Sequence, residues 1–530
     1  MKSIKPTIVA IFILFFVAVS VTSILKKSST TDEFDHIAFG REVITRTLKG
    51  ASMQKMPVTS MNALPVYLIE KIGLKIHKNK KLFIARLPTI AAAAILATFV
   101  FAWSFRLYGF SGGLFSLFLF VFSPNIMAHA RLATNDIYCA LFIFLSVNYF
   151  LRYLKSRNRK EFIIFCLLTG FSEVVKQTAL LLFPFYIIFY LIYEFVIRKK
   201  DIKSELFQYS MLKNKIFKLA VFVLVIVSVI NFSYGFQGSF LTGDDYLRNF
   251  SQKNNAITSN PILVKAASIG SALSFMPIPF PRAFIEAFLV GIYYNATGKG
   301  HGPIYLLGKL SRLGWWYYFP VAAFFKFPVS LFLFMILSLI SIKYRSIQFP
   351  DEIAVFIFTG MLLIFFCFFC SAQIGIRYLL PMLPFAYLFM GRMPGLVMKS
   401  QKWSKMGFLL LMVWYAGSSI SYYPHYISYF NELIGNRMNA YRYLADSNLD
   451  WGQNRRYLNG YIKVHKGEKI SVNPTKKTTG TVIVSANNLV GITHGSERFQ
   501  WLRDHYKPVD QIAYSYLVYK IPETEGDAAP

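Results

Sequence analysis

Three carboxylates and one imidazole lie within five residues, after the first long apolar run of the chain: Asp32, Glu33, Asp35 and His36. If a helix begins here, Asp32, Asp35 and His36 share one face, because side chains three and four residues apart are neighbours on a helix. A carboxylate at the edge of an apolar region is suited to act as a general base. The alternative is helix capping by Thr31 or Asp32, with the acids favoured by the helix dipole. The local pattern is compatible with both.

Three further charged positions stand beside the ends of apolar runs. Asp136 is another cap candidate, but it falls on the same predicted side of the membrane as Asp32, so two acids could flank one site. Arg377 is placed to hold a phosphate group, and the alternative is an arginine that reaches toward lipid headgroups. Lys176 lies near the turn of a short helical hairpin, where we expect an i, i+3 ion pair with Glu173.

The elements that must position these residues are predicted to be membrane helices. Of the 530 residues, 55% are hydrophobic and only 16% are charged, against about 25% charged in soluble domains. This composition excludes a disordered chain and disfavours an ordinary soluble enzyme. A spanning helix needs about 20 apolar residues, and about eleven runs are of this kind: 7–25, 82–104, 113–128, 137–151, 162–175, 178–197, 217–235, 318–342, 353–371, 378–390 and 406–423. The predicted fold class is an all-α polytopic membrane protein.

The distribution of Lys and Arg predicts the orientation, because short cytoplasmic loops carry an excess of positive charge. With a cytoplasmic N-terminus and an uncleaved first helix, most basic loops fall inside, including those at 152–160, 198–218 and 392–405. This requires two short spans in 162–197 that meet near Lys176. A single span there would place the basic run 198–218 outside, so we predict two.

Three segments are then outside the cytoplasm: 26–81, 236–317 and the tail from residue 424. The tail is polar and contains β-prone runs at 481–486 and 513–521, which predict a small α/β region. We therefore expect two domains. Residues 1–423 form a transmembrane domain with the outer loops 26–81 and 236–317, and residues 424–530 form an extracytoplasmic domain.

Several patterns lead to no function. The net charge of +31 comes largely from membrane-flanking loops, where it meets anionic headgroups, so we predict no nucleic-acid partner. Cys367 and Cys370 have CxxC spacing, but they lie in an apolar run without His partners and are expected to be structural thiols. Residues 446–450 resemble a calcium loop, but Trp451 and Tyr457 stand where an EF-hand needs Gly and Glu.

Taken in order, several motifs together resemble glycosyltransferase family 39 of the GT-C superfamily, with its protein mannosyltransferase and lipid A aminoarabinose transferase relatives. The motifs are the acidic stretch 32–36, Ala-Arg-Leu-Pro at 85–88, the segment 123–136, the aromatic segment 306–328, Ile-Arg-Tyr-Leu-Leu-Pro at 376–381, and the segments 429–432 and 446–453. Asn135, where relatives often carry Thr, and Phe327 within a usual Lys-Thr-Pro depart from the pattern.

The resemblance implies a role for each candidate residue. Asp32 would be the general base on the acceptor hydroxyl, supported by Glu33, and Asp136 would be the second acid of the site. Arg377 would bind the donor phosphate, with His36, Lys176 and His301 as further substrate-binding candidates. The donor would be a sugar on polyprenyl phosphate, transferred with inversion. Metal use varies among relatives; we assign no cofactor and no metal ligand and leave a divalent metal open.

The expected function is therefore a membrane glycosyltransferase acting outside the cytoplasm on a protein, lipid or glycan acceptor. The alternative is a transporter or flippase of lipid-linked sugars, which would be expected to carry ionisable residues or broken helices at mid-membrane depth. The ionisable residues concentrate at one face, which favours the enzyme. The expected location is the cell inner or plasma membrane, with the active site and the C-terminal domain outside.

Overall fold

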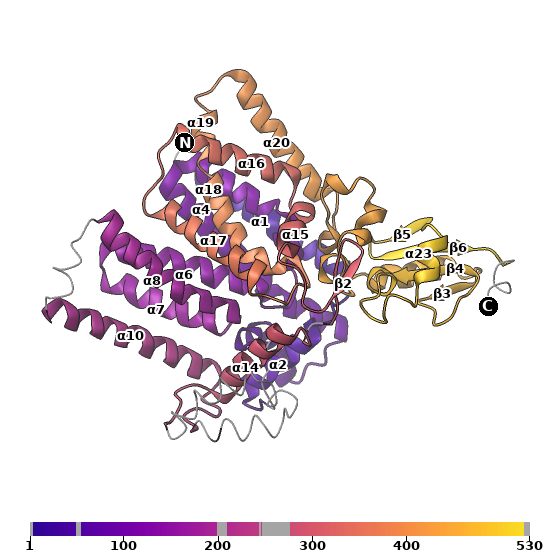
Figure 1. Ribbon diagram of the computed structural model, residues 1–530, viewed down its shortest axis with the longest axis horizontal. Helices are drawn as coiled ribbons and strands as arrows, with labels where there is room; N and C mark the ends of the chain where they lie inside the picture. The colour runs from indigo at the N-terminus through magenta and orange to yellow at the C-terminus, as the bar shows by residue number, and fades with distance from the viewer. Residues whose placement is uncertain are drawn as a thin grey trace.

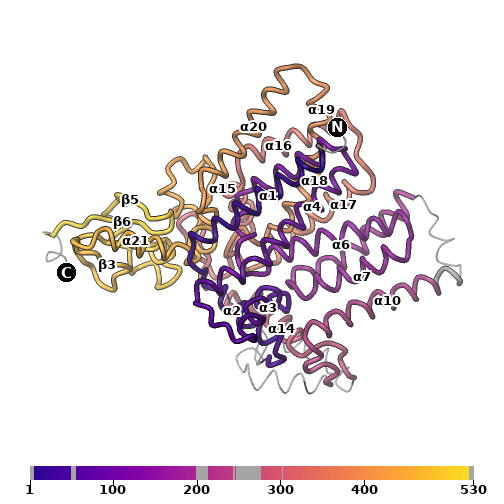
Figure 2. The backbone as a smooth tube through the Cα atoms, turned by 180° about the vertical axis from the view of Figure 1, so that it is seen from behind, coloured from indigo at the N-terminus to yellow at the C-terminus, as the bar shows by residue number. Residues whose placement is uncertain are grey.

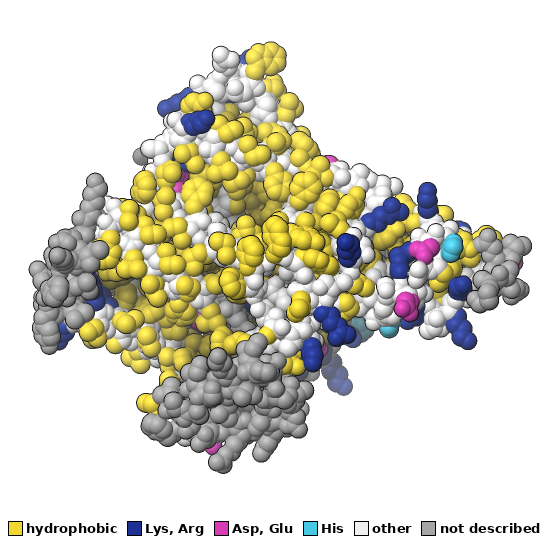
Figure 3. Space-filling model, in the orientation of Figure 1, with side chains coloured by type: hydrophobic (Ala, Val, Ile, Leu, Met, Phe, Trp, Pro, Cys, Tyr) yellow, Lys and Arg dark blue, Asp and Glu magenta, His cyan; other side chains and the backbone are white. Residues whose placement is uncertain are grey.

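The computed structural model describes residues 4–48, 55–198, 209–242, 245, 276–300 and 302–523. A bundle of apolar helices forms the body of the molecule, and a smaller region with a β-sheet projects from one end of it (Figures 1 and 2). The face of the body seen in Figure 3 is covered mainly by hydrophobic side chains, whereas charged side chains gather on the projecting region. The predicted fold class, a helical polytopic membrane protein with a small α/β region at the C-terminal end, is confirmed.

The helices of the body are apolar and mostly long. They are α1 (Ile4–Leu25), α4 (Lys78–Val121), α6 (Asp136–Ser156), α7 (Arg159–Glu173), α8 (Leu182–Leu191), α10 (Tyr209–Ser233), α15 (Tyr318–Lys326), α16 (Val329–Ile340), α17 (Asp351–Phe368), α18 (Leu383–Met390), α19 (Met393–Val397) and α20 (Lys402–Ile420). Shorter helices lie between them: α2 (Glu33–Thr45), α3 (Ser60–Lys71), α5 (Pro124–His129), α14 (Arg282–Thr297), and the 3₁₀ helices η1 (Pro57–Thr59), η2 (Gln177–Leu181) and η5 (Ile376–Met382).

The number of spans differs from the predicted eleven. Within the described ranges, six helices are long and apolar enough to cross a membrane, or seven if the bent pair of α15 and α16 is one span. Part of the difference lies in α4, which holds two predicted spans. Its non-helical break at Gly109 lets the two arms lie side by side, since Ser116 Oγ donates to Ser104 Oγ at 2.8 Å. Another part is the length of helices such as α18, which has 8 residues.

The prediction of one continuous span over 318–342 is wrong, because two helices separated by a bend occupy this segment. The chain bends by 107° between α15 and the helical segment that starts at Val329. Pro328 follows Phe327, whose backbone is extended at φ −94° and ψ 140°, as expected for a residue that precedes proline. Because proline lacks the N–H that a continuing helix would use, the break falls here.

The two predicted spans of 162–197 are confirmed as separate helices, α7 and the segment from η2 through α8. Basic residues that the charge pattern assigned to one face also meet at one end of the bundle. Arg106 donates to Asn148 at 3.0 Å, Arg345 donates to the carbonyl of Leu107 at 3.2 Å, and Arg392 pairs with Glu352 at 3.2 Å.

The C-terminal region folds around a four-stranded sheet of order β3–β4–β6–β5. Its strands are β3 (Ile470–Val472), β4 (Gly480–Ser485), β5 (Asp510–Ile512) and β6 (Tyr516–Ile521), accompanied by α21 (Arg455–Val464), α22 (Ala486–Leu489) and α23 (Gln500–His505). β4 pairs antiparallel with β6 over six residues, and these strands correspond to the predicted β-prone runs. A separate hairpin, β1 (Ile304–Leu306) and β2 (Lys309–Ser311), lies between α14 and α15.

Candidate active site

A cavity of about 390 Å³ lies where the end of the helical body meets the C-terminal region. Asp32 precedes α2, and Arg377 comes from η5. The C-terminal region contributes most of the remaining wall, through Asp446, Asp450, Trp451, Gly452, Asn473, Ser485, Asn487, Thr493 and Tyr516. Carboxylate, amide, hydroxyl and aromatic groups are thus combined in one cavity, a composition suited to a small polar ligand.

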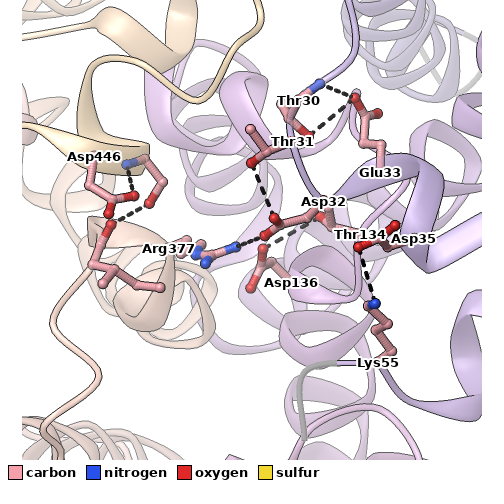
Figure 4. Close-up of polar contacts among 12 residues, drawn as sticks. Thr30, Thr31, Asp32, Glu33, Asp35, Lys55, Thr134, Asp136, Arg377 and Asp446 are labelled. Carbon is pink, nitrogen blue, oxygen red and sulfur yellow. Dashed lines mark hydrogen bonds and ion pairs between the residues drawn. The ribbon is translucent and has the colours of Figure 1, made fainter. Parts of the chain in front are cut away.

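Asp32 and Arg377 face each other across this cavity. Asp32 Oδ2 lies 3.8 Å from Arg377 Nη1, and their side chains are 29% and 10% exposed. Figure 4 shows the guanidinium of Arg377 directed toward Asp32 and Asp136, with Asp446 on its other side. The carboxylate and the guanidinium attract each other electrostatically, but at this distance they do not form a tight hydrogen bond.

The capping interpretation of Asp32 does not describe its contacts. Asp32 occupies the N-cap position of α2 but makes no side-chain cap hydrogen bond; its Oδ1 accepts from Thr31 Oγ1 at 3.1 Å. The prediction that Asp32, Asp35 and His36 share one helix face is confirmed only in part. Asp35 is exposed and pairs with Lys55 at 3.2 Å, whereas His36 is buried behind Asp32. The carboxylate of Asp32 is therefore directed to the cavity and is not used by the helix.

Backbone contacts with the C-terminal region fix the segment that carries Asp32. Thr31 N donates to the carbonyl of Trp451 at 3.0 Å, and Ser28 N donates to that of Gln453 at 3.1 Å. Gly452, between these two acceptors, has φ 85°, and an added Cβ would lie 3.7 Å from the carbonyl oxygen of Ser29. Glycine allows this left-handed backbone without strain. The position of Asp32 therefore depends on a turn in the C-terminal region.

Glu33 does not line the cavity. Its buried carboxylate binds Arg86 through Nε at 2.7 Å and Nη2 at 2.6 Å, and accepts from the backbone N–H of Ala133 at 2.9 Å and Thr30 at 2.8 Å. Burial alone would raise the pKa of Glu33, but Arg86 and these donors outweigh it and hold the pKa below its usual value. Glu33 thus connects α2, α4 and the start of α6 directly behind Asp32.

Asp136 and Lys176 form a second charge pair next to Arg377. Lys176 Nζ donates to Asp136 Oδ1 at 2.8 Å and lies 4.4 Å from the centre of the Tyr378 ring. The expected pair of Lys176 with Glu173 is wrong, because the break after α7 turns Lys176 toward α6. Both carboxylate oxygens of Glu173 are buried without a hydrogen-bond partner among the described residues.

Arg377 does not reach toward lipid headgroups. The residue is buried at 8% exposure, and its guanidinium carbon lies 4.2 Å from the centre of the Trp451 ring. Stacking on an aromatic face holds a guanidinium in place while its N–H groups stay free to bind an anion. Two bodies of structure, the helical bundle and the C-terminal region, therefore position this cation together.

Burial lowers the pKa of the two histidines near the site, His36 and His129. Burial lowers the pKa of His36 to about 4, although Asp32 and Asp136 act in the opposite direction. Burial likewise lowers the pKa of His129 to about 3, and its Nδ1 lies 3.9 Å from Asp136 Oδ2. Burial therefore favours the neutral form of His36, and its Nδ1 has no hydrogen-bond partner among the described residues. His301 lies outside the described residues.

Asp446 and Asp450 were not assigned to the site from the sequence: a calcium loop at these residues was rejected, and segment 446–453 served only as one of the motifs of the family resemblance. Asp446 accepts from the backbone N–H of Ser447 at 2.5 Å, and Asp450 accepts from that of Gly452 at 3.1 Å. Burial raises the pKa of each to about 6, although Arg377 acts against this at Asp446. The signal that could have found them was the match of segment 446–453 to the family pattern.

Metal ligands are a separate question. Within the described ranges, no three His, Cys, Asp or Glu side chains converge so that they could hold a metal ion. Cys367 and Cys370, at the end of α17, are free thiols.

The fold and the site define a class: a multi-pass membrane protein with a polar, carboxylate- and arginine-lined cavity at one end of its helical bundle. Residues 62–231 match the sequence model of the dolichyl-phosphate-mannose-protein mannosyltransferase family, and this match confirms the resemblance predicted from the motifs. It includes Asp136 and Lys176 but neither Asp32 nor Arg377. No curated protein matches the chain significantly.

Among solved structures, the chain is similar to ArnT from Cupriavidus metallidurans. The structure of that protein bound to undecaprenyl phosphate has 12% sequence identity and a TM-score of 0.49, covering 96% of this chain and 97% of the other. Its apo structure covers the same shares, with 13% identity and a TM-score of 0.31.

Proposed function

We propose that this chain is an integral-membrane glycosyltransferase that moves a sugar from a polyprenyl-phosphate donor to an acceptor outside the cytoplasm, with inversion at the anomeric carbon. The observation that carries the proposal is the placement of Asp32 and Arg377 in one cavity, 3.8 Å apart. Sugar transfer from a lipid phosphate needs a base for the acceptor hydroxyl and a cation for the leaving phosphate, and the cavity offers both.

In the proposed reaction, Asp32 accepts the proton of the acceptor hydroxyl while the acceptor oxygen forms a bond to the anomeric carbon. The bond between that carbon and the phosphate oxygen breaks, and its electron pair leaves with the phosphate. Arg377 stabilises the resulting charge, since a fixed cation at a developing anion lowers the barrier. One displacement of this kind inverts the anomeric configuration.

The electrostatics of the site support these roles. Among the described residues, the ion pair that Arg377 forms is with Asp32. A bound phosphate can replace that contact, leaving Asp32 free to accept a proton. Asp136, which pairs with Lys176, would then attract Arg377 electrostatically, while Glu33 fixes the start of α2; we propose Asp136 and Glu33 as positioning residues.

The nature of the donor is supported by the family description, since dolichyl phosphate mannose is itself a sugar on a polyprenyl phosphate. The cavity lies at the end of the apolar bundle, where a lipid-linked phosphate would emerge from the membrane. This place also favours transfer over transport, which needs a substrate path through mid-membrane depth. We propose the orientation expected from the basic loops, with the N-terminus cytoplasmic and this cavity outside.

The proposal is tested with purified protein and a radiolabelled polyprenyl-phosphate sugar, by following label released from the donor and recovered in acceptor fractions. Arg377→Ala is expected to lower transfer by about 100- to 1000-fold and to weaken donor binding. Arg312→Ala, an exposed arginine, is the matched control and should behave as wild type. If wild-type protein consumes no polyprenyl-phosphate sugar, or if Arg377→Ala binds donor normally, the proposal fails.

A further inference from the structure

A second cavity, of about 800 Å³, lies on the other side of the segment that carries Asp32. It is bounded by the end of α1, the start of α4 and the helix α21 of the C-terminal region. Ser28 and Ser29 line this cavity, whereas Thr31 and Asp32 line the catalytic one. A single stretch of backbone therefore separates the two.

The lining of this second cavity is strongly basic. Seven of its seventeen lining residues are Lys or Arg, and none is Asp or Glu. Three of the cations, Lys80, Arg455 and Lys463, are exposed, and the structure gives them no ion pair with any described carboxylate. Cations that are free of protein partners and converge on a hollow form a site for an anion.

Lys27 lies at the base of the cavity and has no carboxylate partner among the described ion pairs. Lys27 is buried at 8% exposure and contacts only neutral groups, His425 Nδ1 at 2.6 Å and the Oδ1 of Asn454. Burial, followed by the charges of Arg131 and Arg86, holds the pKa of Lys27 well below its usual value. Arg131 is also buried, and its Nε and Nη2 have no hydrogen-bond partner among the described residues. An anion bound above Lys27 would act against these effects and favour the protonated form of Lys27.

The remaining wall is apolar and places the cavity at the membrane surface. Leu25 ends α1, and Leu82 and Phe83 belong to the first turns of α4. Both helices are long and apolar enough to span a membrane, so their ends lie at the depth of the headgroups. Apolar side chains on one wall and cations on the other suit an amphiphile with an anionic head.

We propose that this cavity binds a phosphate-bearing group presented at the membrane surface, the phosphorylated headgroup of a lipid. Lys80, Arg455 and Lys463 would contact the phosphate oxygens, and Leu25, Leu82 and Phe83 would contact the apolar part. The site is distinct from the catalytic cavity and does not depend on sugar transfer. A phosphate-bearing lipid held here would lie directly beside the segment that positions Asp32.

The test measures the binding of dioctanoyl phosphatidate and of inorganic phosphate to the purified full-length protein in neutral detergent, by native mass spectrometry and by calorimetry. The variant carries Lys80→Ala and Lys463→Ala. Each lysine near a phosphate contributes electrostatic attraction, so we expect a loss of affinity of about tenfold to thirtyfold, and weaker binding by wild type as salt is raised. The matched control carries Lys476→Ala and Lys477→Ala, two exposed lysines of the C-terminal region.

The two ligands distinguish the source of the phosphate. Phosphatidate bound more tightly than inorganic phosphate, with affinity lost in the Lys80 and Lys463 variant and kept in the control, supports a lipid site. Comparable binding of both ligands with the same variant dependence supports a phosphate site but overturns the apolar contacts. Binding of neither ligand, or an equal loss in both variants, overturns the proposal altogether.

Discussion

Asp32 Oδ2 lies 3.8 Å from Arg377 Nη1, although the two residues are far apart in the sequence, Asp32 after the first apolar helix and Arg377 in η5. The distance is too long for a tight hydrogen bond and short enough for strong electrostatic attraction. A substrate that offers partners to both side chains could therefore separate them at small cost. This is the geometry expected if Asp32 is the proposed base and Arg377 the proposed phosphate-binding cation.

Asp32→Asn is expected to lower sugar transfer by at least about 100-fold, because an amide cannot accept the proton of the acceptor hydroxyl. Donor binding should persist, since Arg377 stays in place. The rate is measured with saturating donor, and binding is measured separately. Asp35→Asn makes the same change on the exposed side of α2, where Asp35 pairs with Lys55, and should leave the rate close to that of wild type. Equal rates for both variants would remove Asp32 from the chemistry.

Lowering the pH below about 6 is expected to weaken donor binding, because Asp446 and Asp450 then become protonated. Burial raises the pKa of each to about 6. An ionised carboxylate accepts hydrogen bonds from sugar hydroxyls at both oxygens, whereas a protonated carboxyl group presents a donor at one of them. KM for the donor should therefore rise on the acid side. In Asp446→Asn the acid limb should become shallower, and a profile identical to that of wild type would exclude Asp446 from sugar binding.

The same two groups should affect stability in the opposite sense. Their pKa values in the folded protein exceed the value of about 3.9 expected for an unfolded chain, so the folded state binds more protons between about pH 4 and pH 6. Their contribution to the free energy of unfolding therefore increases as the pH falls through this range. Thermal unfolding of wild type and Asp450→Asn as a function of pH measures the difference.

Trp451→Ala is expected to weaken donor binding by about tenfold, because the guanidinium of Arg377 loses the ring 4.2 Å away on which it stacks. Trp451→Phe keeps an aromatic face and should restore most of the affinity. The readout is the dissociation constant of the donor. If alanine and phenylalanine give the same affinity, stacking does not position Arg377.

Glu33→Gln is expected to destabilise the protein by about 3–5 kcal/mol, the usual cost of removing one partner from a buried ion pair. Because the pKa of Glu33 is lowered in the folded state, its stabilising contribution is present above its unfolded pKa and is lost as the pH falls through the folded value. Chemical unfolding in detergent measures the effect. Glu468→Gln, which removes an exposed ion pair with Lys520, is the control and should leave the denaturant midpoint of unfolding unchanged. If Glu33→Gln also unfolds at the wild-type midpoint, Arg86 has found another partner.

The sequence predicted much of the fold, because membrane insertion requires long apolar runs and short loops leave a clear charge pattern. The two helices around Lys176 and the strands in the C-terminal tail followed from such local signals. The break at Pro328 was missed, since apolar length alone outweighed the proline in the prediction. The predicted count of about eleven spans exceeds the six or seven of the described residues, because hydrophobicity alone does not distinguish short apolar helices such as α18 from spanning ones.

The site was predictable only where its charged residues stand beside apolar runs. Asp32, in an acidic cluster that follows the first apolar run, and Arg377, at the start of another run, stand out for this reason, and both line the cavity. Lys176 was assigned the wrong partner, because spacing along one helix cannot reveal a carboxylate on another. Asp446, Asp450 and Trp451 lie in a polar region where charged and aromatic residues are common, so nothing local marks them as part of a cavity.

The backbone contacts that join Thr31 to Trp451 and Ser28 to Gln453 have a consequence for biosynthesis. The segment bearing Asp32 precedes the C-terminal strands by more than 400 residues in the chain and is therefore synthesised before them. Because Ser485 of β4 and Tyr516 of β6 line the cavity, the complete cavity can form only after these strands have been synthesised and have packed onto the bundle. If the proposed function holds, a chain that lacks these strands would have an incomplete cavity and would be inactive, even where Asp32 and Arg377 are both present.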